Sequence, residues 1–135
     1  MISVKVVVDC SECLRRLIVE GHAMKDSVSK NYSQNRFYPR NNKKVTSEHN
    51  LVCAAISCLA RSAGIAIMEE TELLCSVEAS ELGRFELSIE KISENKRGWL
   101  LGITDLLLKG INRIVIDNPN QVILVKDKVV IINEG

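Results

Sequence analysis

Cys53 and His22 are the two residues of this chain whose types suit nucleophilic chemistry. A thiolate can attack a peptide carbonyl, and an imidazolium can then protonate the departing amine. This chemistry needs both side chains within hydrogen-bond reach. The simpler interpretation is structural, because a lone cysteine among small helical residues commonly serves packing and a lone histidine after a glycine commonly belongs to a turn.

The apolar pattern around Cys53 predicts a helix that begins at about Asn50 and ends at about Gly64. If Asn50 caps this helix, Cys53 lies in its first turn, where unpaired backbone amides and the helix dipole favour a thiolate. The same amides could form an oxyanion hole. His22 follows Gly21 at the end of a predicted strand, from which its side chain can project into a cleft.

Two short blocks carry a resemblance to a known family. The first is VEGHA at residues 19–23, and the second is LVCAAIS at residues 51–57. Together they resemble the signature blocks of the ribosomal-processing cysteine protease family, Prp. That family has Gly-His-Ala after its second strand and Asp-Ile-Val-Cys-Ala-Ala-Val-Ser at the start of a helix. The order of predicted strands and helices also fits the family along the whole chain.

The resemblance implies a function and a set of site residues. His22 and Cys53 match the family's catalytic residues, with Asn50, Glu48 and Ser57 as possible supporting residues. The implied activity is removal of a short N-terminal extension from bacterial large-subunit ribosomal protein L twenty-seven, with cleavage after an aromatic residue. The family also implies a homodimer with a mobile loop between the two blocks. No cofactor is expected.

The chain departs from the family pattern near the predicted nucleophile. Asn50 stands where the family has aspartate, and Glu48 stands where it has glycine. An asparagine can still cap a helix and orient an imidazole, as in Cys-His-Asn arrangements. The spacing from His22 to Cys53 is also wider than in the family, so an insertion lies beside the substrate cleft. The alternative function is therefore a non-catalytic ribosome- or RNA-associated binding module on the same scaffold.

Residues 24–47 are predicted to form a long inserted loop, because apolar periodicity disappears there and polar turn formers dominate. Basic residues alternate in this segment with Tyr32, Phe37 and Tyr38, a pattern that can bind phosphates and stack on single-stranded RNA. Contact with ribosomal RNA is one hypothesis, and a solvated lid is the other. The basic residues are Lys25, Lys30, Arg36, Arg40, Lys43 and Lys44.

The rest of the chain alternates strand pairs with one further helix. This arrangement predicts an α+β fold with a largely antiparallel sheet and two helices packed on it in two layers. A single domain over residues 1–135 is expected, because 135 residues with 46% hydrophobic content can close one core. The predicted elements are strands at 2–8, 14–20, 73–79, 84–91, 121–126 and 128–132, with a turn at Asp127-Lys128, and a helix from Trp99 to Ile114.

The amino-acid composition argues against several classes of protein. The 18 basic and 17 acidic residues give a net charge of +1, too small a field to imply DNA or membrane binding by the whole protein. No export signal and no apolar stretch of about 18 to 20 residues are apparent, so a cytoplasmic protein without membrane partners is expected. Five cysteines in such a chain favour reduced thiols over a disulfide framework.

Several other residues compete for a chemical role. Cys10 and Cys13 form a CxxC motif, and zinc binding completed by His22 or His49 stays open, although no second CxxC follows. His49 also competes as the base, since it lies four residues before Cys53. His22 is favoured because it lies in the matching block. The residues expected to pack in the core are Cys58, Cys75 and Trp99.

Overall fold

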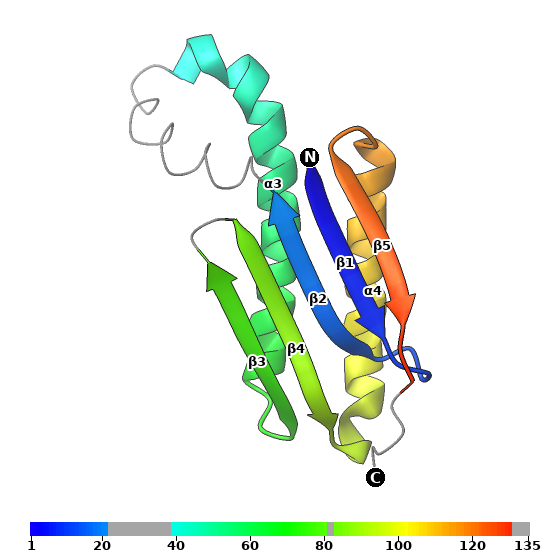
Figure 1. The fold of residues 1–135 in the computed structure, drawn as a ribbon. Helices are drawn as coiled ribbons and strands as arrows, with labels where there is room; N and C mark the ends of the chain where they lie inside the picture. The colour runs from blue at the N-terminus through cyan, green and yellow to red at the C-terminus, as the bar shows by residue number, and fades with distance from the viewer. Residues whose placement is uncertain (22–38, 81–82, 131–135) are drawn as a thin grey trace.

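The computed structural model describes residues 1–21, 39–80 and 83–130, with the backbone alone over residues 39–50. Most of the predicted elements are present (Figure 1). In chain order they are β1 (Ile2–Val8), β2 (Leu14–Gly21), α3 (Pro39–Met68), β3 (Leu73–Ser80), β4 (Arg84–Ile92), a short 3₁₀ helix η2 (Glu94–Lys96), α4 (Arg97–Asp117) and β5 (Val122–Lys128).

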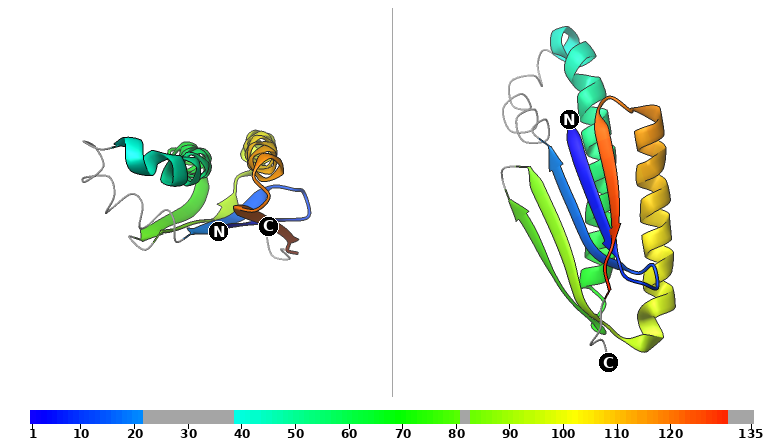
Figure 2. Two further views of the ribbon diagram at one scale, coloured as in Figure 1. Left: turned by 90° about the horizontal axis from the view of Figure 1, so that it is seen from above. Right: turned by 45° about the vertical axis from the view of Figure 1, so that its right-hand side comes forward.

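The strands form one five-stranded sheet in the order β3-β4-β2-β1-β5. Every neighbouring pair is antiparallel except β1 and β5, which run parallel with Ile2 opposite Val122. Both long helices cover the same face of the sheet (Figure 2). The α+β prediction, with a largely antiparallel sheet and two packed helices in two layers, is confirmed.

The core lies between the sheet and the two helices. Strand residues alternate between this core and the open face of the sheet, as β1 shows with Ile2, Val4 and Val6 buried and the residues between them exposed. The face of α3 that carries the small residues Cys53, Ala60 and Gly64 also packs against the core. A Cβ on Gly64 would lie 3.1 Å from Cζ of Phe85, so the glycine allows α3 to approach the sheet closely. This face therefore packs within the chain.

The start of α3 differs from the prediction. The helix begins at Pro39, so the loop predicted over residues 24–47 is wrong from residue 39 onward, and residues 22–38 lie outside the described structure. Proline suits the first position of a helix, because its fixed φ and missing N–H are tolerated there. The beginning of α3 projects beyond the ends of β1 and β2 (Figure 1). A helical segment that covers no sheet buries no apolar face. Its sequence therefore lacks the helical spacing of apolar residues from which a helix is predicted.

The end of the chain also differs from the prediction. β5 continues in parallel register with β1 as far as Val8 opposite Lys128, so the turn predicted at Asp127-Lys128 is wrong. The charges that suggested a turn are accommodated along the strand. Lys5 Nζ lies 3.5 Å from Asp127 Oδ2, and Lys128 Nζ lies 2.6 Å from Glu12 Oε2. Of the strand predicted at 128–132, Lys128 belongs to β5, residues 129–130 are in no strand, and residues 131–132 lie outside the described structure.

Two of the residues expected in the core lie at the surface. Cys58 is exposed, and Trp99 is 36% exposed with Lys96 Nζ 5.6 Å from the centre of its ring. Cys75 is half-buried, with its Sγ 3.6 Å from Met68 Sδ. The residues that anchor α4 in the core are instead Leu100, Thr104, Leu107 and Ile111.

One segment of α3 is more apolar than the sequence analysis stated. Leu51–Met68 is long and apolar enough to cross a membrane by length and composition, with a mean hydropathy of 1.9. The expectation that no such stretch exists is therefore wrong. A core helix passes the same test, and Val52, Ile56 and Ile67 of this segment are buried against the sheet. The segment is 39% buried, so core packing accounts for these buried residues, whereas Leu51, Ile65 and Met68 are exposed.

We predict that Gly83→Ala lowers the free energy of unfolding by about 1–2 kcal/mol. The left-handed backbone conformation is less favourable by that amount for a residue with a Cβ than for glycine. Gly83 has a φ of 80° in the turn between β3 and β4, and its carbonyl accepts a hydrogen bond from the Gly21 amide at 3.2 Å. Urea unfolding measures the change. Gly98→Ala is the matched control, since nothing lies within 4 Å of a Cβ there, and it should raise stability. Equal stability of the Gly83→Ala variant and the native chain would contradict the prediction.

Candidate active site

Cys53 lies in the interior of α3 and not in its first turn. The helix begins at Pro39, so the predicted cap at Asn50 is wrong in this structure. An amide in a helix interior donates to the carbonyl four residues earlier, so the amides around Cys53 are not available to bind an oxyanion. The side chain is 4% exposed and belongs to the core cluster. In this conformation Cys53 is a packed helical residue.

The environment of Cys53 disfavours a thiolate. Burial raises the pKa of its thiol above the ordinary value, and the positive charge of the amino terminus at Met1 partly opposes this effect. Since that charge acts on the thiol, Cys53 lies toward the end of the sheet where β1 begins. Ile2 pairs there with Gly21, the last residue of β2. β2 therefore ends at the same end of the sheet as Cys53.

The other predicted site residues are described only in part. His22 lies outside the described residues, so its distance to Cys53 is not defined. Asn50, Glu48 and the competing His49 lie in α3, where the structure gives the backbone alone. Ser57 is half-buried, one turn after Cys53. Of the basic residues proposed to contact RNA, Lys25, Lys30 and Arg36 lie outside the described structure, and Arg40, Lys43 and Lys44 lie in α3 without described side chains.

A groove of about 290 Å³ lies between α3 and the end of α4, beside the turn that holds Cys53. Most of its wall is aliphatic, and one end carries a carboxylate and an amide. Such a wall suits an apolar side chain of a peptide. The contribution from α4 was not predicted, because the Asn118-Pro119 stop signal marks only where the helix ends. The lining residues are Leu51, Val52, Ala55, Ile114, Asp117 and Asn118.

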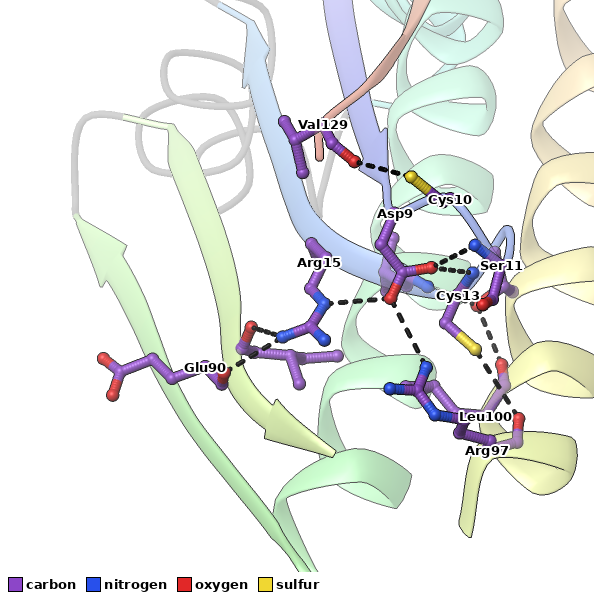
Figure 3. Close-up of polar contacts among 12 residues, drawn as sticks. Asp9, Cys10, Ser11, Cys13, Arg15, Glu90, Arg97, Leu100 and Val129 are labelled. Carbon is purple, nitrogen blue, oxygen red and sulfur yellow. Dashed lines mark hydrogen bonds and ion pairs between the residues drawn. The ribbon is translucent and has the colours of Figure 1, made fainter. Parts of the chain in front are cut away.

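A buried ion-pair cluster lies at the opposite end of the sheet (Figure 3). Asp9 and Arg15 are 4% and 6% exposed, with Arg15 Nε 3.2 Å from Asp9 Oδ2. The same oxygen lies 3.7 Å from Nη1 of Arg97. Asp9 Oδ1 accepts hydrogen bonds from the amides of Ser11 at 2.9 Å and Cys13 at 3.1 Å. The acceptors of Arg15 on β4 are the backbone carbonyls of Ile89 and Glu90.

This cluster joins the β1–β2 turn to β4 and to the first residue of α4, which is a structural role. The two cysteines of the CxxC motif lie in the same turn but face different partners. Cys10 Sγ lies 3.9 Å from the carbonyl oxygen of Val129, and Cys13 Sγ lies 3.6 Å from that of Arg97. Burial raises the pKa of the Cys13 thiol. Within the described ranges, no group of three metal-ligating side chains could hold a metal ion.

Comparison with known proteins gives the family of the chain. The model of the family described as cysteine protease Prp matches residues 1–123. SMU.848 from Streptococcus mutans is similar in structure, with a TM-score of 0.68 and 18% identity over 96% of both chains. The essential ribosomal processing protease Prp from S. aureus, in complex with a covalently linked product peptide, is also similar. Its TM-score is 0.63 at 17% identity, over 94% of this chain and 100% of that one.

The same S. aureus protease in complex with a substrate peptide gives a TM-score of 0.64 at 16% identity, with the same coverage. No curated protein matches the chain. At these identities the structural likeness establishes the fold. The family match extends over most of the chain and includes both Gly21-His22-Ala23 and the block around Cys53. The chain belongs to the cysteine protease Prp family.

Proposed function

We propose that this chain is a cysteine endopeptidase that removes the N-terminal extension of bacterial large-subunit ribosomal protein L twenty-seven, and so acts in ribosome maturation. The observation that carries the proposal is the family match over residues 1–123, which includes His22 and Cys53. The fold supports it, because similar S. aureus structures are of a ribosomal processing protease with substrate and covalently linked product peptides.

The proposed reaction uses the two residues in named roles. Cys53 Sγ attacks the carbonyl carbon at the cut, and a thioester forms as the peptide C–N bond breaks. The imidazolium of His22 gives its proton to the leaving amine, and the neutral ring then takes a proton from the water that hydrolyses the thioester. Asn50 or Glu48 would orient the ring. The end of β2 at Gly21 supports this assignment, because Gly21, which directly precedes His22 in the sequence, lies at the same end of the sheet as Cys53.

The groove between α3 and α4 supports a substrate with an apolar side chain away from the cut itself, because Cys53 is not among the residues that line the groove. Its aliphatic wall, including Leu51 and Ile114, would receive one such side chain as the peptide passes α3. In this proposal the residue before the cut is aromatic. The enzyme would act in the cytoplasm as a homodimer, without a cofactor.

We also propose that the basic residues between His22 and Asn50 contact ribosomal RNA. Arg40, Lys43 and Lys44 stand near the start of α3, where basic side chains would meet phosphates at the end of the molecule that projects beyond the sheet. Replacing all three with serine should weaken binding of single-stranded RNA at low salt by about tenfold or more. Fluorescence anisotropy measures the affinity, and unchanged binding would refute the RNA contact.

A second function, a non-catalytic binding module, is favoured by one observation. Cys53 is 4% exposed within a continuous helix, as a residue retained for packing would be. The two functions differ in what happens to a bound peptide. The module would hold the ribosomal peptide without cutting it.

The deciding experiment incubates the purified chain with a peptide that spans the extension junction of the cognate ribosomal protein. Mass spectrometry of the products should show a single cut after an aromatic residue. A scrambled peptide of the same composition is the control. Binding of the peptide by the folded chain, with no product after prolonged incubation, would support the binding module instead.

A further inference from the structure

The groove between α3 and the end of α4 arises from a change of side-chain size along α3. The two helices run in opposite directions (Figure 1). They approach closely where a Cβ on Gly110 would lie 3.0 Å from Cδ1 of Leu59. One turn away, Ala55 of α3 and Ile114 of α4 both line the groove. Because alanine does not fill the space that Leu59 fills one turn later, the helices leave a groove at this level.

The size of the groove suits side chains of a peptide better than a whole small molecule. Its volume of about 290 Å³ lies at the lower limit of small-molecule pockets, which hold about 300–1,000 Å³. Leu51 lines the groove and is 69% exposed, so it contributes little to the core. An apolar side chain seated in the groove would remove this leucine from water.

The end of the groove that α4 forms is negative. Asp117 is the last residue of α4, and the last turn of the helix holds no basic residue. A helix C-terminus carries the negative end of the dipole, where a cation is favoured and an acidic side chain is not. Arg113 Nε lies 3.5 Å from Asp117 Oδ2, but the two side chains are 74% and 55% exposed. Such an exposed pair is weak, and the end of α4 therefore still attracts a cation.

Asp117 is the group at this end that would recognise a charged ligand. The backbone amide of Asn118 donates to the carbonyls of Ile114 and Val115, and its Nδ2 donates to the Ile114 carbonyl at 3.0 Å. These carbonyls of the last turn are thus already partnered within the chain. Among the residues that line the groove, Asp117 alone carries a charge. An acidic residue that departs from the usual pattern of a helix end is often there for function.

We propose that this groove is a specificity subsite, which binds an apolar side chain of the substrate against Leu51 and Ile114 and a neighbouring basic side chain at Asp117. The proposal rests on the proposed function for the identity of the ligand. Cys53 does not line the groove, so the subsite acts on substrate binding away from the cut. The substrate class is a peptide segment with a basic residue within about two positions of an apolar one.

The test measures binding separately from cleavage. The probe is a fluorescein-labelled junction peptide of the cognate ribosomal protein, in which the amide nitrogen at the cut is methylated so that the bond resists hydrolysis. Fluorescence anisotropy at low salt gives its Kd for each variant. An analogue with glutamine in place of every basic residue isolates the contribution of charge. A cognate junction that lacks a basic residue near an apolar one would overturn the proposal at once.

Leu51→Ser tests the apolar wall, and Leu106→Ser is its matched control. The two leucines are 69% and 70% exposed, so neither substitution leaves a cavity in the core. Leu51→Ser should raise the Kd of the probe by about fivefold or more, because the apolar contact with the ligand is lost. Leu106 does not line the groove, and its variant should stay within about twofold of the native chain. Equal affinities of the two variants would overturn the subsite.

Asp117→Lys tests the charge, and Asp105→Lys is its matched control. Asp105 also lies on α4, is 62% exposed and pairs with Lys109 at 3.0 Å. Asp117→Lys should raise the Kd of the basic probe by about fivefold, because attraction becomes repulsion, and should leave the glutamine analogue within about twofold. Asp105→Lys should change neither value. An equal effect of Asp117→Lys on both peptides, or no effect on either, would overturn the assignment of Asp117.

The subsite and the proposed function can fail separately. If the native chain binds the probe with these differences but leaves the unmethylated junction peptide uncut, the protease function is rejected and the peptide subsite stands. If the native chain cuts the junction peptide while all four variants bind the probe alike, the subsite alone is rejected.

Discussion

Replacing Cys53 with alanine should reduce cleavage of the junction peptide by on the order of 10⁴-fold, because no other group of the site would replace the attacking sulfur. His22→Ala should cost a similar factor, since a thiol with a raised pKa depends on its base to become a thiolate. The double variant should be no slower than either single variant, as expected for residues that act as a unit. Single-turnover cleavage followed by mass spectrometry measures these rates.

Cys58→Ala is the control for these variants. Cys58 lies in the same helix but is exposed, so its loss should change the cleavage rate by less than about twofold. Because Cys53 is buried, its alanine variant also needs a stability measurement to show that it remains folded. A folded Cys53→Ala variant that retains a few per cent of native activity would remove Cys53 from the role of nucleophile.

Replacing Asp9 with alanine should lower the free energy of unfolding by about 3–5 kcal/mol, the cost of breaking a buried ion pair by removing one partner. Arg15 is 6% exposed and would lose its carboxylate partner at 3.2 Å. The amides of Ser11 and Cys13 would lose their acceptor as well. Such a loss is a large fraction of the stability of a domain of this size. Urea unfolding, followed by circular dichroism, measures it.

Asp127→Ala is the matched control for the Asp9 variant. Asp127 forms an ion pair with Lys5 at 3.5 Å, but its side chain is 54% exposed, and such surface pairs contribute about 0–1 kcal/mol. The two variants remove the same group and differ in burial. A loss below about 1 kcal/mol for Asp9→Ala would contradict the structural role of the buried cluster.

The sequence was most informative where an element buries one face. The two antiparallel hairpins and α4 were predicted because alternation and helical spacing record which side chains enter the core. The length of β5 could not be predicted from such a pattern. Asp127 and Lys128 resemble a turn in sequence, and only the partners Lys5 and Glu12, distant in the chain, show that a strand can hold them.

The site was predictable in its residues but not in its geometry. The block around Cys53 pointed to the family, and the family match confirms that resemblance. The depth of Cys53 in a longer helix was not predictable, because residues 39–47 carry no apolar period and resemble a loop. The Asp9–Arg15 pair was missed for a related reason. Charged residues beside a hairpin turn are usually solvated, and only the packing of β4 and α4 against this turn buries them.

The most direct test of the account is to identify the cysteine that a substrate-derived inhibitor modifies. A peptide chloromethyl ketone, ending in the aromatic residue before the cut, should form a covalent adduct with the native chain. Peptide mapping should place the adduct on Cys53 alone, with Cys10, Cys13, Cys58 and Cys75 unmodified, and His22→Ala should slow its formation. An adduct on another cysteine, or cleavage by the native chain that persists when Cys53 is blocked, would contradict the assignment of Cys53 as the nucleophile.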